Sequence, residues 1–122
     1  MRLEDIYQFF TDRSATYLTQ EQAVCYVLSV LLEGESYGTE LIQKLESDYP
    51  PYRLSDSVLY AALNFLETEQ ALASHLQKVE GRGRPRRMYQ VSPQWFDEAQ
   101  KLAALWTNSV ARKPQASKAV AV

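Results

Sequence analysis

The sequence has very little of what enzymes and metal proteins use for their chemistry. It contains one cysteine, Cys25, and one histidine, His75, in 122 residues. A single cysteine excludes an internal disulfide, and these two residues cannot supply the ligands of a usual zinc site. The chain also lacks a nucleophile-elbow motif, a phosphate-binding loop and any patterned pair of carboxylates. We therefore expect no catalytic activity, no cofactor and no bound metal.

Long hydrophobic runs are also missing. The longest apolar stretch, around AVCYVLSVLL, is about ten residues long and includes Ser29, which is too short for a bilayer span. It has neither the basic flank nor the cleavage site of a signal peptide. Hydrophobic residues make up 46% of the chain and charged residues 23%, as in ordinary globular proteins. We expect one cytoplasmic domain with its own core.

Positive charge is scarce overall but concentrated in one place. The formal net charge of the chain is −2, yet residues 78–87, KVEGRGRPRR, hold five basic side chains against one acid. A protein with one basic end and an acidic remainder has the charge distribution of a binding surface for a polyanion. The alternative is a solvated surface turn that has no partner.

Hydrophobic spacing predicts a series of helices. They are expected at residues 3–10, 19–33, 36–49, 55–70 and 93–112. Thr19 and Gln22 have the form of a capping box, and Ser36 and Ser55 are the expected N-caps of the next two helices. Pro93 suits the first turn of the last helix.

Two segments, 71–79 and 87–92, alternate as short strands do, and they flank a glycine-rich arginine tip at 81–86. Three helices followed by such a hairpin predict a winged helix-turn-helix, a mainly α fold with a small β-hairpin. The expected organisation is an N-terminal helix or arm at 1–18, a DNA-binding domain at 19–92, a dimerisation helix at 93–112 and a disordered tail at 113–122.

This fold places two groups of residues on duplex DNA. The helix at 55–70 enters the major groove by its exposed face, and the hairpin tip reaches phosphates or the minor groove, where arginine is favoured. The expected DNA-binding residues are Ser55, Ser57, Tyr60, Asn64, Lys78, Arg82, Arg84, Arg86 and Arg87. Three of them have structural alternatives: Ser55 as a cap only, Tyr60 as a cover of the core, and Arg87 as a strand residue.

Two acids, Asp56 and Glu67, fit this picture poorly because carboxylates repel phosphates. Asp56 can serve as a favourable first-turn charge of the helix, or as an acceptor for cytosine or a neighbouring arginine. The sequence does not choose between these roles.

The last helix carries an apolar seam with spacings of four, three, four and four, as in a coiled coil. Since no later element covers this seam, we expect it to face a second copy of the chain rather than the chain's own core. The expected dimer-interface residues are Ile6, Tyr7, Phe10, Trp95, Ala99, Leu102, Trp106 and Val110.

Three motifs carry a resemblance to a known family: "YG.EL" at 37–41, "LYAAL" at 59–63 and "GRPRRMYQVS" at 83–92. In this order they resemble the PadR-like family of winged-helix transcriptional regulators over residues 24–93. The sequence of residues 21–41 is similar to that of the cyanobacterial members of the family, which include a circadian clock regulator. The short single C-terminal helix resembles the smaller subgroup of the family.

The resemblance implies a homodimer that binds operator DNA, usually as a repressor, with the first and last helices supplying the dimer contacts. It also allows a small-molecule effector near the dimer interface, although no residue pattern here specifies one. The sequence departs from the family at three places: the family usually has a threonine where Val58 stands, a proline where Ala61 stands and a glycine near Gln70.

The sequence thus predicts a cytoplasmic, nucleoid-associated transcriptional regulator with the DNA duplex and a second copy of itself as partners. A protein-interaction module that binds an acidic protein through the same fold is the alternative, because acids lie near the predicted recognition helix.

Overall fold

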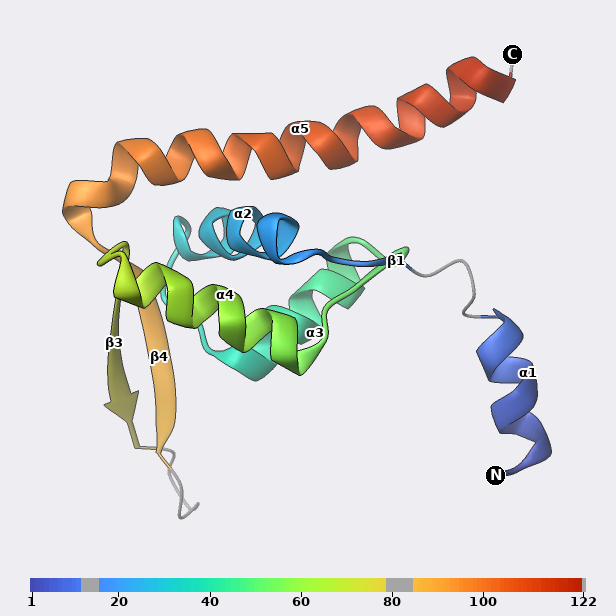
Figure 1. Ribbon diagram of the computed structural model, residues 1–122, viewed down its shortest axis with the longest axis horizontal. Coiled ribbons are helices and arrows are strands. Elements are labelled where there is room, and N and C mark those ends of the chain that lie inside the picture. Colours follow the sequence, from blue (N-terminus) through green and yellow to red (C-terminus); the bar gives the residue numbers. More distant parts are fainter. Residues whose placement is uncertain (12–15, 79–84, 122) are drawn as a thin grey trace.

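The computed structural model describes residues 1–11, 16–78 and 85–121, with only the backbone given for residues 8–11 and 111–121. In chain order the elements are α1 (Leu3–Thr11), β1 (Thr16–Tyr17), α2 (Gln20–Leu31), α3 (Gly38–Asp48), β2 (Tyr52–Arg53), α4 (Asp56–Thr68), β3 (Leu72–Gln77), β4 (Arg86–Val91), the 3-10 turn η2 (Pro93–Trp95) and α5 (Phe96–Ala121). Helices α2, α3 and α4 are followed by the β3–β4 hairpin (Figure 1), which confirms the winged helix-turn-helix.

Helix α2 is the centre of the core. The predicted capping box starts it: the Gln22 N–H donates to the Thr19 hydroxyl at 3.2 Å, and the Thr19 N–H donates to the Gln22 side chain at 2.9 Å. Its apolar residues are buried on opposite sides, because α4 and α3 cover one side and α5 covers the other (Figure 1). A nearly continuous apolar helix needs such double cover.

Helix α3 begins one residue later than expected. Ser36 was predicted as its N-cap, but Tyr37 occupies that position and offers no side-chain cap. Ser36 is instead held by Tyr89 of β4, with which it exchanges two backbone hydrogen bonds of 2.8 and 3.1 Å. Ser36 thus pairs with the hairpin as a short third strand, and its hydroxyl donates to the Glu40 side chain instead of accepting a backbone N–H of the first turn.

Helix α4 ends in a Schellman motif. The Ala71 N–H donates to the Leu66 carbonyl and the Gln70 N–H to the Glu67 carbonyl, at 2.8 and 2.9 Å. This arrangement needs a left-handed residue, and Gln70 takes it with φ 66°. Glycine would adopt this conformation without a steric cost.

The hairpin is antiparallel, with register from Leu72 opposite Val91 to Gln77 opposite Arg86. Tyr89 and Val91 are buried against the helices, so the hairpin is anchored at its base. It extends past α4 on the side away from α5 (Figure 1). This confirms the predicted strands, while the centre of the tip, residues 79–84, lies outside the described residues.

A two-residue parallel ladder, which the sequence did not predict, joins β1 to β2. Thr16 pairs with Tyr52 and Tyr17 with Arg53. Strands this short leave no alternation to detect. The ladder matters because it fixes Arg53 just before the start of α4.

Helix α5 corrects the prediction for the apolar seam. Ala99 and Trp106 were expected at a dimer interface, but they are buried in the chain's own core, with Trp106 only 2% exposed. The indole lies edge-on to the rings of Tyr26, Tyr49 and Tyr52 at centroid distances of 5.3 to 5.6 Å. The reason is α2, whose second apolar face needs this cover.

The remaining seam residues, Trp95, Leu102 and Val110, are partly buried against the same core. Leu105, which was not among the expected interface residues, is instead a large exposed side chain of α5. The sequence predicts a disordered tail from residue 113, whereas α5 continues to Ala121. Alanines at 116, 119 and 121 favour helix there, even though Pro114 does not.

Helix α1 lies apart from the helical body in Figure 1. Its apolar side chains are not covered: Leu3 is 66% exposed, Ile6 43% and Tyr7 68%. The side chain of Phe10, the third N-terminal interface residue expected, lies outside the described residues. Of the helices that are described, none has the length and apolar character needed to cross a bilayer.

Candidate nucleic-acid interface

The exposed face of α4 carries three of the expected DNA-binding residues. Ser57 and Asn64 are exposed, and Tyr60 is 51% exposed. Ser55 stands before the helix, where its hydroxyl accepts the Val58 N–H at 3.2 Å. Ser55 is therefore the N-cap, as predicted, and Ser57, Tyr60 and Asn64 are the expected DNA-binding residues that α4 itself presents outward, next to the exposed Asp56 of its first turn.

Tyr60 is placed by a glycine of the neighbouring helix. Its hydroxyl lies so close over Gly38, the first residue of α3, that a Cβ on Gly38 would overlap it. Gly38 thus allows close packing of α3 against α4. The contact holds a half-exposed phenol at the surface of α4.

The tip end of the two hairpin strands carries two more of the expected basic residues. Lys78 is exposed immediately after β3. The Arg86 guanidinium stacks over the Tyr37 ring at 3.9 Å, a cation–π contact that orients it next to the start of α3. Arg82 and Arg84 belong to the tip and lie outside the described residues.

Arg87 was expected on DNA, with a structural role in the strand as the alternative. Its side chain makes a hydrogen bond within the protein. Its Nη1 donates to the Ser74 hydroxyl at 2.9 Å, and the Ser74 hydroxyl donates to Glu67 Oε2 at 2.6 Å. Glu67, which seemed poorly suited to a DNA-binding helix, is therefore part of an internal link. Burial raises the pKa of the adjacent Tyr89, Glu67 raises it further and Arg87 opposes this.

Arg53 is a basic residue near the recognition helix that sequence reasoning missed. Its Nη1 donates to the carbonyls of Pro50 and Tyr52 at 2.6 and 2.9 Å. These bonds hold the Arg53 side chain next to the backbone that precedes Ser55, the N-cap of α4. The available signal was a lone arginine two residues before a predicted N-cap, which is suited to a phosphate contact.

Two further polar features lie away from α4. Glu35 and His75 form a contact of 3.5 Å between the α2–α3 turn and β3. Among the described residues there is no cluster of three or more side chains suited to a metal ion.

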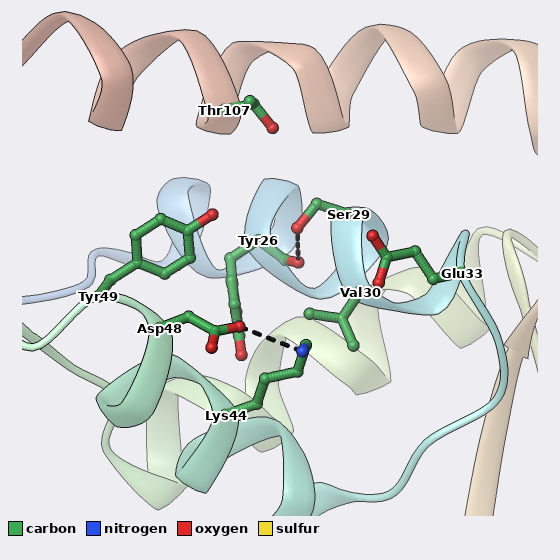
Figure 2. Close-up of a pocket in the computed structure, with 8 residues that line it drawn as sticks. All are labelled: Tyr26, Ser29, Val30, Glu33, Lys44, Asp48, Tyr49 and Thr107. Carbon is green, nitrogen blue, oxygen red and sulfur yellow. Dashed lines mark hydrogen bonds and ion pairs between the residues drawn. The ribbon is translucent and has the colours of Figure 1, made fainter.

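A polar pocket of about 260 Å³ lies between α2, α3 and α5. Figure 2 shows Lys44 and Asp48 on one side of it and Thr107 of α5 on the other. Lys44 pairs with Asp48 at 3.1 Å, which holds the pKa of Lys44 above its ordinary value. The hydroxyls of Ser29 and Thr107 donate to carbonyls of their own helices. Lys44, Asp48, Ser29 and Thr107 thus have partners within the protein, and we assign no ligand to this pocket.

Comparison with known proteins agrees with this geometry. The model of the transcriptional regulator PadR-like family matches residues 27–97. The solved structure of the circadian clock associated protein Pex from anabaena is similar, with 60% identity, a TM-score of 0.81, and coverage of 93% of this chain and 99% of that one. Pex from Synechococcus gives 57% identity, a TM-score of 0.77 and coverage of 90% and 98%.

More distant structures share the fold alone. A PadR family transcription regulator from Clostridium difficile is 18% identical, with a TM-score of 0.59 over 76% of this chain and 95% of that one. A search of curated proteins found no match. The family model covers more than half of the chain, and the expected resemblance, including that to a cyanobacterial clock regulator, is confirmed. The chain belongs to the PadR-like family of transcriptional regulators.

Proposed function

We propose that this protein is a homodimeric transcriptional regulator that binds double-stranded DNA in a sequence-specific manner. The observation that carries the proposal is the placement of α4 and the basic hairpin. The exposed face of α4 presents Ser57, Tyr60 and Asn64. The hairpin extends past α4 (Figure 1), and Lys78 and Arg86 stand at the described end of its two strands. A duplex that receives α4 in its major groove meets the hairpin along its backbone or minor groove.

The two surfaces divide the work of recognition. Helix α4 has no lysine or arginine, so it contributes hydrogen-bonding groups rather than positive charge. The basic residues from Lys78 to Arg87 supply the attraction to phosphates, and that attraction depends on salt because bound counterions are released. Ser57, Tyr60 and Asn64 therefore determine the specificity for base sequence. The hairpin and Arg53 supply the affinity for the phosphate backbone.

A second copy of the chain covers the apolar surface that this chain leaves open. Leu3, Ile6 and Tyr7 of α1 and Leu105 of α5 are exposed. A two-fold dimer through these helices carries two copies of α4, and their half-sites lie about one helical turn apart on the operator. Occupation of a promoter by such a dimer, in the cytoplasm and on the nucleoid, represses transcription by occlusion.

The similarity to Pex connects this activity to the circadian clock. That relative is described as circadian clock associated, and it is 60% identical over nearly its whole length. We therefore place the regulated genes among those that set or follow a circadian rhythm. Deletion of the gene then changes the period of a rhythmic reporter, and an unchanged period contradicts this assignment.

The triple variant Arg82→Ala, Arg84→Ala, Arg86→Ala tests the hairpin's role. We expect weaker binding to every duplex and a slope of log K against log salt that falls by about two to three, since each lost phosphate contact removes roughly 0.9. Fluorescence anisotropy across a salt titration measures both. Lys118→Ala, distant in sequence, is the control for the loss of one positive charge elsewhere in the chain. Unchanged binding of the triple variant across the titration contradicts the proposal for the hairpin.

A further inference from the structure

Two hydrogen bonds between side chains connect α4 to both strands of the hairpin. Glu67 lies on α4, Ser74 on β3 and Arg87 on β4. The Ser74 hydroxyl donates to Glu67 Oε2 at 2.6 Å and accepts from Arg87 Nη1 at 2.9 Å. We call this set the Glu67–Ser74–Arg87 link.

The chemistry of the link gives it a direction. A serine hydroxyl has one proton, so donation to Glu67 leaves its lone pairs for Arg87. A charged group stands at each end, and hydrogen bonds to charged groups are shorter and stronger than neutral ones. Glu67 and Ser74 are partly buried, which limits screening by water. The link is thus a defined connection rather than a loose surface contact.

The position of the link matters because two surfaces must fit one duplex. Helix α4 and the hairpin can engage together only when their relative orientation matches the spacing of groove and backbone. Two linked binding surfaces lose their joint affinity when the geometry prevents simultaneous contact. Opposite Arg87 on β3 stands Leu76, beyond the buried part of the hairpin, so apolar packing fixes only its base.

We propose that Glu67 is a positioning residue for DNA recognition, which acts through Ser74 and Arg87 to set the orientation of the hairpin relative to α4. The inference rests on the proposed function, since it assigns how the two DNA-binding surfaces cooperate. Glu67 need not touch DNA for this role. Its carboxylate is retained next to a polyanion because the link requires an acceptor.

Charge and positioning make opposite predictions for Glu67→Ala. Removal of a negative charge close to DNA raises affinity for any duplex if charge alone matters. Loss of the link instead lowers affinity for the operator, by about tenfold for a charge-assisted bond, while affinity for unrelated duplexes stays equal or rises. The sign of the operator effect therefore distinguishes the two roles.

Two further variants isolate the link. Ser74→Ala breaks it without a change of charge, and we expect a loss of operator affinity similar to that of Glu67→Ala. Glu67→Gln keeps an acceptor for Ser74, and we expect it to retain most of the operator affinity. The double variant Glu67→Ala, Ser74→Ala should lose no more than either single variant, because both remove one interaction.

Glu69→Ala is the matched control. Glu69 follows α4 directly, is exposed, and has no side-chain partner among the described residues. It removes the same charge two residues away and leaves the link intact. We expect operator affinity equal to or slightly above that of the wild type.

Fluorescence anisotropy measures the affinity of each variant for the operator that the wild type selects from random duplexes. The same measurement on a scrambled duplex of equal length gives the non-specific affinity. Residual dipolar couplings of the free protein measure the orientation of β3 and β4 against α4. We expect this orientation to change in Glu67→Ala and Ser74→Ala but not in Glu69→Ala. Thermal unfolding confirms that each variant is folded at the assay temperature.

Operator binding by Glu67→Ala that is equal to or tighter than that of the wild type overturns the inference, as does an unchanged hairpin orientation. The couplings need no DNA, so they test the orientation even if the wild type selects no operator. In that case the proposed function fails on its own, and a changed orientation still shows that the link positions the hairpin.

Discussion

Gln70 shows how a single residue can carry a cost that the fold requires. The Schellman motif at the end of α4 needs a left-handed residue, and Gln70 supplies it with φ 66°. For a residue with a Cβ this conformation costs about 1–2 kcal/mol. The turn that leads from the recognition helix into β3 therefore forms despite its sequence, because Leu66 and Ala71 are both buried on either side of it.

Gln70→Gly should stabilise the protein. Relief of the left-handed strain, partly offset by the greater freedom of glycine in the unfolded chain, gives a gain of about 1 kcal/mol, or roughly 3–6 °C in the melting temperature. Thermal unfolding at fixed protein concentration measures it. Gln70→Ala, which keeps a Cβ, should show no such gain. A glycine variant that melts at or below the wild-type temperature contradicts the account of this turn.

The environment of Cys25 lowers the reactivity expected of its thiol. The thiol is half-buried on α2, and burial raises its pKa above the usual value because the charged thiolate loses solvation. At pH 8 the thiolate fraction is therefore lower than in free cysteine. We expect reaction with an aromatic disulfide reagent to be about tenfold slower than that of glutathione, and to recover in guanidinium. Equal rates in the folded protein count against this environment for Cys25.

At the scale of elements, α5 is the helix whose role differs most from expectation. Trp106 fixes it to the helix-turn-helix, since its indole packs among three tyrosine rings from α2 and from the segment after α3. Buried aromatic clusters of this kind add about 0.5–1.5 kcal/mol per pair to the effect of area burial. Helix α5 is thus part of the folding unit as well as a candidate for dimer contacts.

Trp106→Ala should lower the free energy of unfolding by about 3–5 kcal/mol, as for other buried aromatic residues. Trp106→Phe should cost less, because it also removes an indole N–H that has no hydrogen-bond partner among the described residues. Gln100→Ala, an exposed change on the same helix, should stay within about 0.5 kcal/mol of the wild type. Urea unfolding at fixed concentration compares the three. A Trp106→Ala variant as stable as Gln100→Ala shows that α5 is not bound through this residue.

The elements that the sequence predicts well are those with local signals. The Thr19–Gln22 capping box, the Ser55 cap and the alternation of the hairpin strands are each encoded within a few residues. Non-local partners decide the rest. Ser36 has the local form of a cap, but pairing with Tyr89 of β4 moves the start of α3.

The same distinction applies to the candidate site. The exposed residues of α4 follow from helical periodicity, whereas the role of Glu67 depends on a serine seven residues away and an arginine on another strand. Arg53 depends on a two-residue ladder that no sequence pattern marks. The seam of α5 has a correct period, but period alone does not tell whether a core or a second copy covers it.

At the scale of the whole molecule, the hairpin and α5 lie on opposite sides of α2 (Figure 1). The proposed function therefore separates the DNA-binding surface from the helix that is a candidate for dimer contacts. The chain's formal charge is −2, while residues 78–87 hold five basic side chains against one acid. In the proposed function this charge distribution would orient the protein on a duplex before contacts form.

Binding-site selection from random duplexes, with the purified full-length protein, tests the central claim most directly. The proposed function predicts an enriched inverted repeat whose half-sites lie about one helical turn apart, and loss of its specific positions in a Ser57→Ala, Asn64→Ala variant. Selection that enriches no motif contradicts sequence-specific DNA binding and favours a protein-interaction module with this fold.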